Sequence, residues 1–230
     1  MKKFGLFLLA AAAAITLSSC NDDDNGDYAS AITLGSVHVM GVASDYYFTL
    51  DNGQRAYPSD KTRIGAFTPN NGDRVVFTYN KLDTPADGFD LNIALYAIAT
   101  VRMGETATVT THDQLDALGD AKATPYQWCP TTRYNFNLSL LFNASDAKKH
   151  TFTLVRNNTP GVSYEMTESG YYNLELRHDT GDDTQGTTVS EWMTFNLTEF
   201  TAELQDMKGI IVKFETMNDG TRYFKFDLGK

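Results

Sequence analysis

The strict alternation of apolar and polar residues after residue 133 constrains the fold of this chain more than any other feature. Between residues 134 and 142 every second side chain is large and apolar, and this set is Tyr134, Phe136, Leu138, Leu140 and Phe142. Since successive side chains of a strand point to opposite faces, this period predicts a half-buried strand. Further strands are predicted over residues 150–156, 171–178, 189–197, 209–216 and 223–228. Six or so short strands separated by turns predict an antiparallel β-sandwich over residues 131–230.

The first half of the chain predicts a second all-β unit, over residues 31–103. Strands are expected at residues 32–42, 46–50, 74–79 and 89–101, and Asn52-Gly53 is a strong signal for a hairpin turn. The last of these strands is long and carries apolar residues on both faces. A strand of this kind suits a small coiled barrel better than a flat sheet. The expected fold class is therefore all-β, with a small β-barrel followed by a sandwich.

Residues 104–130 have a different character from the two units on either side. One short capped helix is predicted over residues 111–118, and it ends at Gly119. The rest of this stretch is polar and rich in turn-forming residues. We therefore expect residues 104–130 to form a linker that contains the domain boundary.

The N-terminus predicts where the protein is located. Lys2 and Lys3 precede an apolar run over residues 4–17, which is too short to span a bilayer comfortably and is typical of a signal peptide over residues 1–19. The run ends in Leu17-Ser18-Ser19-Cys20, which resembles a bacterial lipobox. This resemblance implies a diacylglycerol on the Cys20 thiol, cleavage before Cys20 and an acyl group, commonly palmitate, on the new amino group. Because each buried methylene contributes roughly 0.8 kcal/mol, two or more acyl chains would hold the protein on a membrane.

An acidic segment, residues 20–30, follows the lipidated cysteine. It can act as a flexible solvated tether between the lipid and the first domain. The three consecutive residues Asp22, Asp23 and Asp24 also resemble the lipoprotein export signal of the Bacteroidota, which directs lipoproteins to the outer face of the outer membrane. We favour the export signal, because a generic spacer has no reason to place three aspartates directly after the cysteine.

The charge and the cysteines exclude several classes of partner and bond. The net charge is −10, and loss of Lys2 and Lys3 with the signal peptide makes it −12. Such a chain is repelled by nucleic acid phosphates and anionic lipid heads, so nucleic acid is not an expected partner. The second cysteine, Cys129, has no partner for an intrachain disulfide once Cys20 carries lipid. It is more simply interpreted as a small buried hydrophobe than as a reactive thiol.

The order of these parts resembles the NigD-like family. The resemblance is carried by the lipobox, the Asn52-Gly53-Gln54 hairpin, the strand start Gly72-Asp73-Arg74-Val75-Val76-Phe77, the short helix and the segment Leu174–His178. It implies an oligonucleotide/oligosaccharide-binding (OB) type barrel followed by an immunoglobulin-like β-sandwich. The family takes its name from a bacteriocin gene cluster, where an immunity or accessory role was suggested. The resemblance carries over no catalytic residues.

No catalytic or metal-binding signature is present, so no enzyme, cofactor or metal is predicted. The chain lacks a nucleophile elbow, a phosphate-binding glycine loop and a zinc-protease motif. The four histidines, His38, His112, His150 and His178, show no metal-ligand spacing. The acidic loop of residues 179–184 could offer oxygen ligands to calcium, but it departs from the EF-hand pattern and is better interpreted as a solvated loop.

Aromatic residues are the best candidates for ligand contacts, and we single out Tyr46, Tyr47, Tyr126 and Trp128. Rings can stack on sugars or anchor a protein partner, although core packing explains most aromatic side chains. The sequence thus predicts a surface-facing outer-membrane lipoprotein with a non-catalytic binding or structural accessory role and a protein or glycan ligand. The alternatives are a bacteriocin-immunity-type protein and a hydrolase with an unrecognised site.

Overall fold

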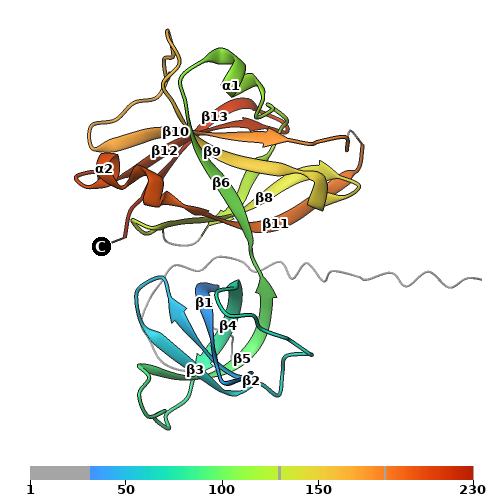
Figure 1. Ribbon diagram of the computed structural model, residues 1–230, viewed down its shortest axis with the longest axis vertical. Helices are drawn as coiled ribbons and strands as arrows, with labels where there is room; N and C mark the ends of the chain where they lie inside the picture. Colours follow the sequence, from blue (N-terminus) through green and yellow to red (C-terminus); the bar gives the residue numbers. More distant parts are fainter. Residues whose placement is uncertain (1–31, 129–130, 184, 230) are drawn as a thin grey trace, which may run out of the picture.

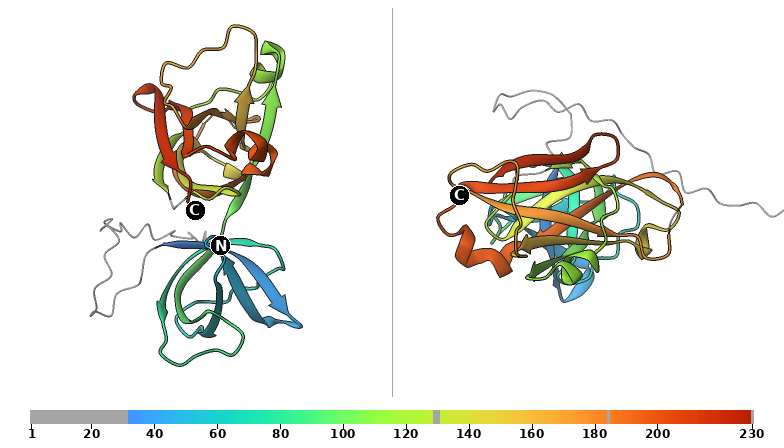
Figure 2. Two further views of the ribbon diagram at one scale, coloured as in Figure 1. Left: turned by 90° about the vertical axis from the view of Figure 1, so that its left-hand side faces the viewer. Right: turned by 90° about the horizontal axis from the view of Figure 1, so that it is seen from above.

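The computed structural model describes residues 32–128, 131–183 and 185–229 of the 230-residue chain. It contains two β domains, and β6 (Arg102–Val109) runs directly from the first into the second (Figure 1). The left view of Figure 2, turned by 90° about the vertical axis, again shows the two domains as separate bodies. The predicted fold class, an OB-type barrel followed by a β-sandwich, is confirmed.

The first domain is a closed barrel of five strands in the order β1-β2-β3-β5-β4. The strands are β1 (Thr33–Met40), β2 (Val42–Leu50), β3 (Arg55–Asp60), β4 (Arg74–Lys81) and β5 (Leu91–Thr100). The predicted Asn52-Gly53 turn joins β2 to β3, and Gly53 has φ +85°. The interior is filled by side chains, and the buried apolar set is Val37, Tyr46, Phe48, Leu50, Ala56, Val75, Phe77, Ile93 and Leu95. Closure pairs every strand on both sides and leaves the barrel without a sheet edge.

Strand β3 was not among the strands expected from the sequence. It contains Pro58, which cannot donate to a strand ladder and so argues against a central strand. The structure accommodates Pro58 because the parallel pairing of β3 with β5 shifts register between Pro58 and Asp60. Closure of the barrel therefore decides the conformation of this segment against its local signal.

The second domain is one eight-stranded sheet in the order β13-β12-β10-β9-β6-β11-β8-β7. Besides β6 it comprises β7 (Thr124–Trp128), β8 (Asn135–Ala144), β9 (Thr151–Asn157), β10 (Tyr171–Asp179), β11 (Thr187–Asn196), β12 (Gly209–Thr216) and β13 (Gly220–Asp227). The short helical segments are α1 (His112–Asp116), α2 (Thr201–Leu204) and the 3₁₀ turns η1 (Ala147–Lys149) and η2 (Leu197–Phe200). The sheet is mixed rather than purely antiparallel, since β10–β12, β6–β9 and β6–β11 pair in parallel.

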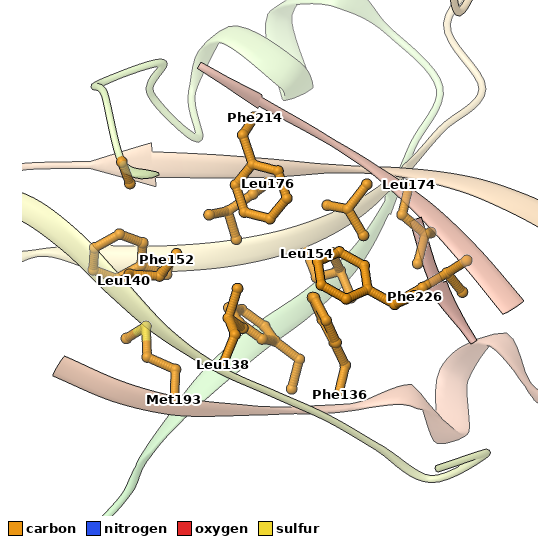
Figure 3. Close-up of a cluster of buried hydrophobic side chains, with 14 of the residues drawn as sticks. Phe136, Leu138, Leu140, Phe152, Leu154, Leu174, Leu176, Met193, Phe214 and Phe226 are labelled. Carbon is orange, nitrogen blue, oxygen red and sulfur yellow. The ribbon is translucent and has the colours of Figure 1, made fainter. Parts of the chain in front are cut away.

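The sheet curls into two layers that enclose one apolar core. Its two ends approach each other beside β7, where the Ala123 N–H donates to the Glu215 carbonyl at 2.8 Å. Figure 3 shows the enclosed side chains, with Leu138 and Met193 on one side of the core and Leu176 and Phe214 on the other. The apolar positions of the predicted strand at residues 134–142 fill this core, except that Tyr134 precedes β8 and is exposed.

The stretch expected to be a linker supplies α1 and two strands, β6 and β7, and both strands pair within the second sheet. The predicted helix is present, and Thr111 and Gln114 form its capping box. Gly104 allows β6 to lie against β11, because a Cβ atom at Gly104 would come within 2.2 Å of the Phe195 ring. This steric reason explains the glycine at position 104, and the segment is nevertheless part of the sheet.

A buried polar cluster joins the two domains. Asp51, at the end of the β2 hairpin, accepts two hydrogen bonds from the Arg74 guanidinium at 2.8 and 2.9 Å. The Asn137 amide donates to the same carboxylate at 2.7 Å, and Asn135 donates at 3.2 Å. Asn137 in turn accepts from Thr194 at 2.8 Å. The polar face of β8 is therefore buried at Asn137, because it binds an ion pair of the barrel.

Candidate functional site

Two of the four predicted ligand-contact residues lie in the barrel, and neither presents a free ring face. Tyr46 is 2% exposed and packs edge-on against Phe48 in the barrel core. Tyr47 is half-buried on the outer face, where its ring stacks on His38 at 4.7 Å. Core packing thus accounts for Tyr46, and contact with neighbouring rings accounts for Tyr47.

The rings around Tyr47 form a packed group on the outside of the barrel. Phe89, from the β4–β5 loop, lies 5.3 Å from Tyr47 and stacks on Tyr57 at 5.0 Å. The Arg55 guanidinium lies 4.6 Å above Tyr47 and 4.8 Å above Phe89. Because these groups occupy one another's faces, the cluster fastens the β4–β5 loop to the barrel.

Tyr126 and Trp128 are different, because both are more than half exposed. Their exposed fractions are 52% and 53%, and both lie on β7, which forms one edge of the eight-stranded sheet. A register shift in the β7–β8 pairing lies between Pro125 and Gln127. The Trp128 ring is held by an edge-to-face contact with Phe226, with ring centroids 5.7 Å apart. The edge of the sandwich therefore presents two large rings on a rigid strand.

A cavity of about 470 Å³ lies at one end of the sandwich. It is lined by the segment before β7, by the β10–β11 loop and by the β12–β13 hairpin, and the residues include Lys122, Asn143, His178, Thr180, Asp183 and Asn218. The loops that connect strands converge here, as they do at the ends of other sandwiches.

A buried chain of titratable groups reaches one wall of this cavity. Nδ1 of His150 lies 2.7 Å from Nε2 of His178, and Nε2 of His150 lies 3.3 Å from Oδ2 of Asp183. The Asp183 carboxylate also accepts hydrogen bonds from the Ser145 hydroxyl and from the backbone N–H groups of Ser145 and Asp146. Every carboxylate oxygen of Asp183 is thus occupied by a donor from the protein.

Burial is the main cause of the altered ionisation of His178. It lowers the pKa of His178 to about 4, and the nearby His150 adds to this effect. The backbone of Lys122 and Ala121 opposes the shift, but no hydrogen bond of ordinary geometry reaches Nδ1 of His178 within the described residues. Hydrogen bonds from Ser145 and Asp146 hold the pKa of Asp183 far below its usual range. His178 is therefore neutral, and Asp183 charged, at neutral pH.

These side chains do not form an evident catalytic or metal site. A nucleophile needs a base within hydrogen-bond reach, but the Ser145 hydroxyl donates to Asp183 at 2.6 Å rather than to an imidazole. In the part of the chain that the structure describes, no group of three or more His, Cys, Asp or Glu side chains could hold a metal ion. In the loop considered for calcium, Asp182 pairs with Lys149 at 2.8 Å and Asp179 accepts from the Gly181 N–H.

Sequence reasoning placed His150 and His178 near strand ends but did not bring them together. They are 28 residues apart, and Asp183 is 33 residues from His150. Only the antiparallel pairing of β9 with β10, which sets His178 opposite Phe152, makes them neighbours. The predicted lipidation site Cys20, the export signal Asp22, Asp23 and Asp24, and Cys129 lie outside the described residues.

Comparison with known protein families gives two matches along the chain. Residues 37–101 match the NigD-like N-terminal OB domain, and residues 106–228 match the NigD-like C-terminal beta sandwich domain. The matched ranges meet at β6, in agreement with the two domains of the structure. None of the curated proteins is similar enough to the chain to count as a relative.

Several solved structures share the fold over most of their length. A protein of unknown function from Bacteroides vulgatus has 23% identity and a TM-score of 0.69, covering 86% of this chain and 90% of its own. A candidate lipoprotein from Bacteroides fragilis has 15% identity and a TM-score of 0.58, with coverages of 87% and 99%. A NigD-like immunity protein from Bacteroides caccae has 17% identity and a TM-score of 0.55, with coverages of 85% and 95%.

The described residues also bear on membrane attachment. Among them, no helix has the length and apolar character that crossing a membrane requires.

Proposed function

Since this chain belongs to the NigD-like family, we propose that it is a lipid-anchored, surface-facing accessory protein of the outer membrane that binds a protein or a glycan without catalysing a reaction. The observation that carries the proposal is the pair of exposed rings, Tyr126 and Trp128, on the edge strand β7. No nucleic acid is expected as a ligand, because the chain carries an excess of ten negative charges.

Exposed rings on a rigid strand are well suited to binding. Tyr and Trp bring a large apolar surface with few rotatable bonds, so little conformational entropy is lost when a partner covers them. Trp128 is restrained further by its contact with Phe226. A tyrosine or tryptophan ring can stack on a sugar or fill a pocket of a protein, and both ligand classes are compatible with this edge.

The lipobox and the acidic segment support the location. Cys20 would carry the lipid, and Asp22, Asp23 and Asp24 would direct the protein to the outer face. A structural neighbour from Bacteroides fragilis is named as a candidate lipoprotein. Cys20→Ala should release the protein from the membrane fraction or leave the precursor uncut. Replacement of the three aspartates by alanine should preserve attachment but protect the protein from protease added to intact cells.

The binding role is tested by crosslinking the full chain on intact cells and identifying the protein or glycan retained. Tyr126→Ala combined with Trp128→Ala should reduce specific crosslinking at least tenfold, as expected when aromatic anchors are removed. Val42→Ala is the matched control, because Val42 is 61% exposed but lies on the barrel. Equal crosslinking by all three forms would contradict the proposal.

An immunity-type role is the second candidate. The observation that favours it is the shared fold with the NigD-like immunity protein from Bacteroides caccae. In that case the retained ligand would be a bacteriocin, and expression of the chain would protect a sensitive strain. Protection that survives the Tyr126 and Trp128 changes would place the toxin contact elsewhere on the surface.

A further inference from the structure

The cavity at the end of the sandwich has features that the exposed rings of β7 do not explain. Its volume of about 470 Å³ lies within the usual range of small-molecule sites. It is built from four segments far apart in sequence, near residues 122, 143, 180 and 218. The proposed function does not use this cavity, since binding here needs neither Tyr126 nor Trp128.

Three side chains around the cavity are free to contact a ligand. The side chains of Lys122, Thr180 and Asn218 make no hydrogen bond or ion pair to the described part of the chain. Asn143 uses its amide oxygen to accept from Thr188 at 2.9 Å, which leaves its amide N–H groups available. Amides and hydroxyls can donate and accept, so this rim suits a ligand with several hydroxyl groups.

The charges of the cavity favour a neutral ligand. The Asp183 carboxylate lines it, but four hydrogen bonds from Ser145, Asp146 and His150 already occupy its oxygens. An incoming cation therefore finds only Oδ1 of Asp183 with a lone pair to spare, and Lys122 on the rim repels it. An incoming anion meets Lys122 but also the charge of Asp183. Neither sign of charge is favoured by the cavity as a whole.

One wall carries a polar atom that the protein leaves unsatisfied. His178 is 2% exposed, its ring is fixed by stacking on Phe152 at 4.1 Å, and its Nδ1 has no hydrogen-bond partner in the described residues. This nitrogen is fully buried, and the backbone of Lys122 and Ala121 lies close enough to raise the pKa of His178, so Nδ1 belongs to the wall beneath the lining rather than to the surface that a ligand touches. Ala121 and Met217 complete the lining with apolar surface.

We propose that this cavity binds a neutral, hydroxyl-rich ligand of monosaccharide or disaccharide size, such as the terminal residue of an uncharged glycan. The amide and hydroxyl groups of Asn143, Thr180 and Asn218 bind the sugar hydroxyls. The apolar C–H groups of the sugar ring lie against Met217 and Ala121. A charged sugar fits this site less well than its neutral counterpart.

The test is saturation-transfer NMR on the full chain with a panel of single sugars. Glucose, galactose, mannose and N-acetylglucosamine are the neutral probes, and glucuronate and glucosamine are the charged ones. At least one neutral sugar should bind more tightly than either charged sugar. Absence of binding by every neutral sugar, or tighter binding of the charged ones, would overturn the proposal.

Substitutions of cavity residues test whether the sugar binds in the cavity. Asn218→Ala and Thr180→Ala should each weaken binding about tenfold, the loss typical of one hydrogen bond. Asn158→Ala is the matched control, because Asn158 is an exposed asparagine outside the cavity. Lys122→Ala is a second variant in case a loop variant folds poorly. The Lys122→Ala protein should still bind neutral sugars, and it should bind glucuronate no more tightly than the wild type does. Unchanged binding in both cavity variants would show that the sugar binds elsewhere and contradict this assignment.

The double change at Tyr126 and Trp128 should leave the binding of single sugars intact. Failure of this proposal and failure of the proposed function are therefore distinguishable.

Discussion

The barrel and the sandwich use aromatic residues in opposite ways. On the barrel, Phe89 stacks on Tyr57 and packs at a tilt against Tyr47, and these contacts hold the β4–β5 loop in place. On the sandwich, Tyr126 and Trp128 stand on an edge strand and remain more than half exposed. A closed barrel has no edge strand, whereas the open sheet has two, β13 and β7. The surface features suited to binding therefore belong to the domain whose sheet stays open.

The cavity follows the same division. It lies where loops converge at the end of the sandwich, and the buried chain from His178 to Asp183 belongs to that domain as well. The barrel instead contributes Asp51 and Arg74 to the contact between the domains. The two ligand sites that we propose, the exposed rings of β7 and the cavity, therefore both lie in the sandwich.

The largest expected effect tests whether the two cores are independent. Phe136→Ala removes a ring that packs on Phe226 at 4.7 Å in the sandwich core, and it should cost about 3–5 kcal/mol of unfolding free energy. Phe77→Ala should cost a similar amount in the barrel, where Phe77 stacks on Phe48 at 4.4 Å. Trp128 packs on Phe226 in the sandwich, whereas Trp192 packs against Leu34 and Val101 at the contact with the barrel. The fluorescence of Trp128 in a Trp192→Phe background therefore reports on the sandwich during urea unfolding. Equal shifts of this transition in the two variants would show a single cooperative unit.

A smaller effect is expected at the contact between the domains. Asp51→Ala leaves the Arg74 guanidinium buried without its carboxylate and should cost about 3 kcal/mol, the lower end for a broken buried ion pair. Differential scanning calorimetry should then show the unfolding transitions of the two domains further apart than in the wild type. Combining Arg74→Met with Asp51→Leu removes both charges and should recover most of the lost stability. A double variant as unstable as Asp51→Ala would show that the charge itself is required.

The stability of the sandwich, which contains His178, should depend on pH in a way that the barrel does not share. The expected change in unfolding free energy is a few kcal/mol at most. His178 has a pKa of about 4 in the folded protein, below its ordinary value of 6.5. The unfolded chain therefore binds a proton more readily, and the stability from neutral His178 is lost as pH falls from 6.5 towards 4. Trp fluorescence should show the sandwich weakening over this range. His178→Phe should flatten the dependence, and an unchanged slope in that variant would assign the titration to another group.

The smallest stability effect is expected at an exposed ring. Tyr126→Ala removes a side chain that is 52% exposed, so unfolding free energy should change by no more than about 0.5 kcal/mol. The same change should weaken ligand capture on cells. A large loss of stability would mean that Tyr126 packs against the domain, and the contrast with the barrel rings would then disappear.

Local patterns in the sequence determined much of the architecture. Period-two alternation identified β8, and the Asn52-Gly53 turn identified the hairpin of β2 and β3. Thr111 and Gln114 marked the start of α1, because a capping box needs only neighbouring residues. These features depend on a few consecutive positions, so the order of barrel, short helix and sandwich could be read from the sequence.

Tertiary structure decided what local patterns leave open. Pro58 lies in a strand and polar β6 pairs at the middle of a sheet, since closure and strand order are set by residues far away in the chain. Tyr46 and Trp128 look equally suitable for binding in the sequence, yet one is in the core and the other is exposed. The register of β9 with β10 brings His178 beside His150 and Asp183. Side-chain environment depends on these non-local pairings, and a single sequence does not specify them through local preference.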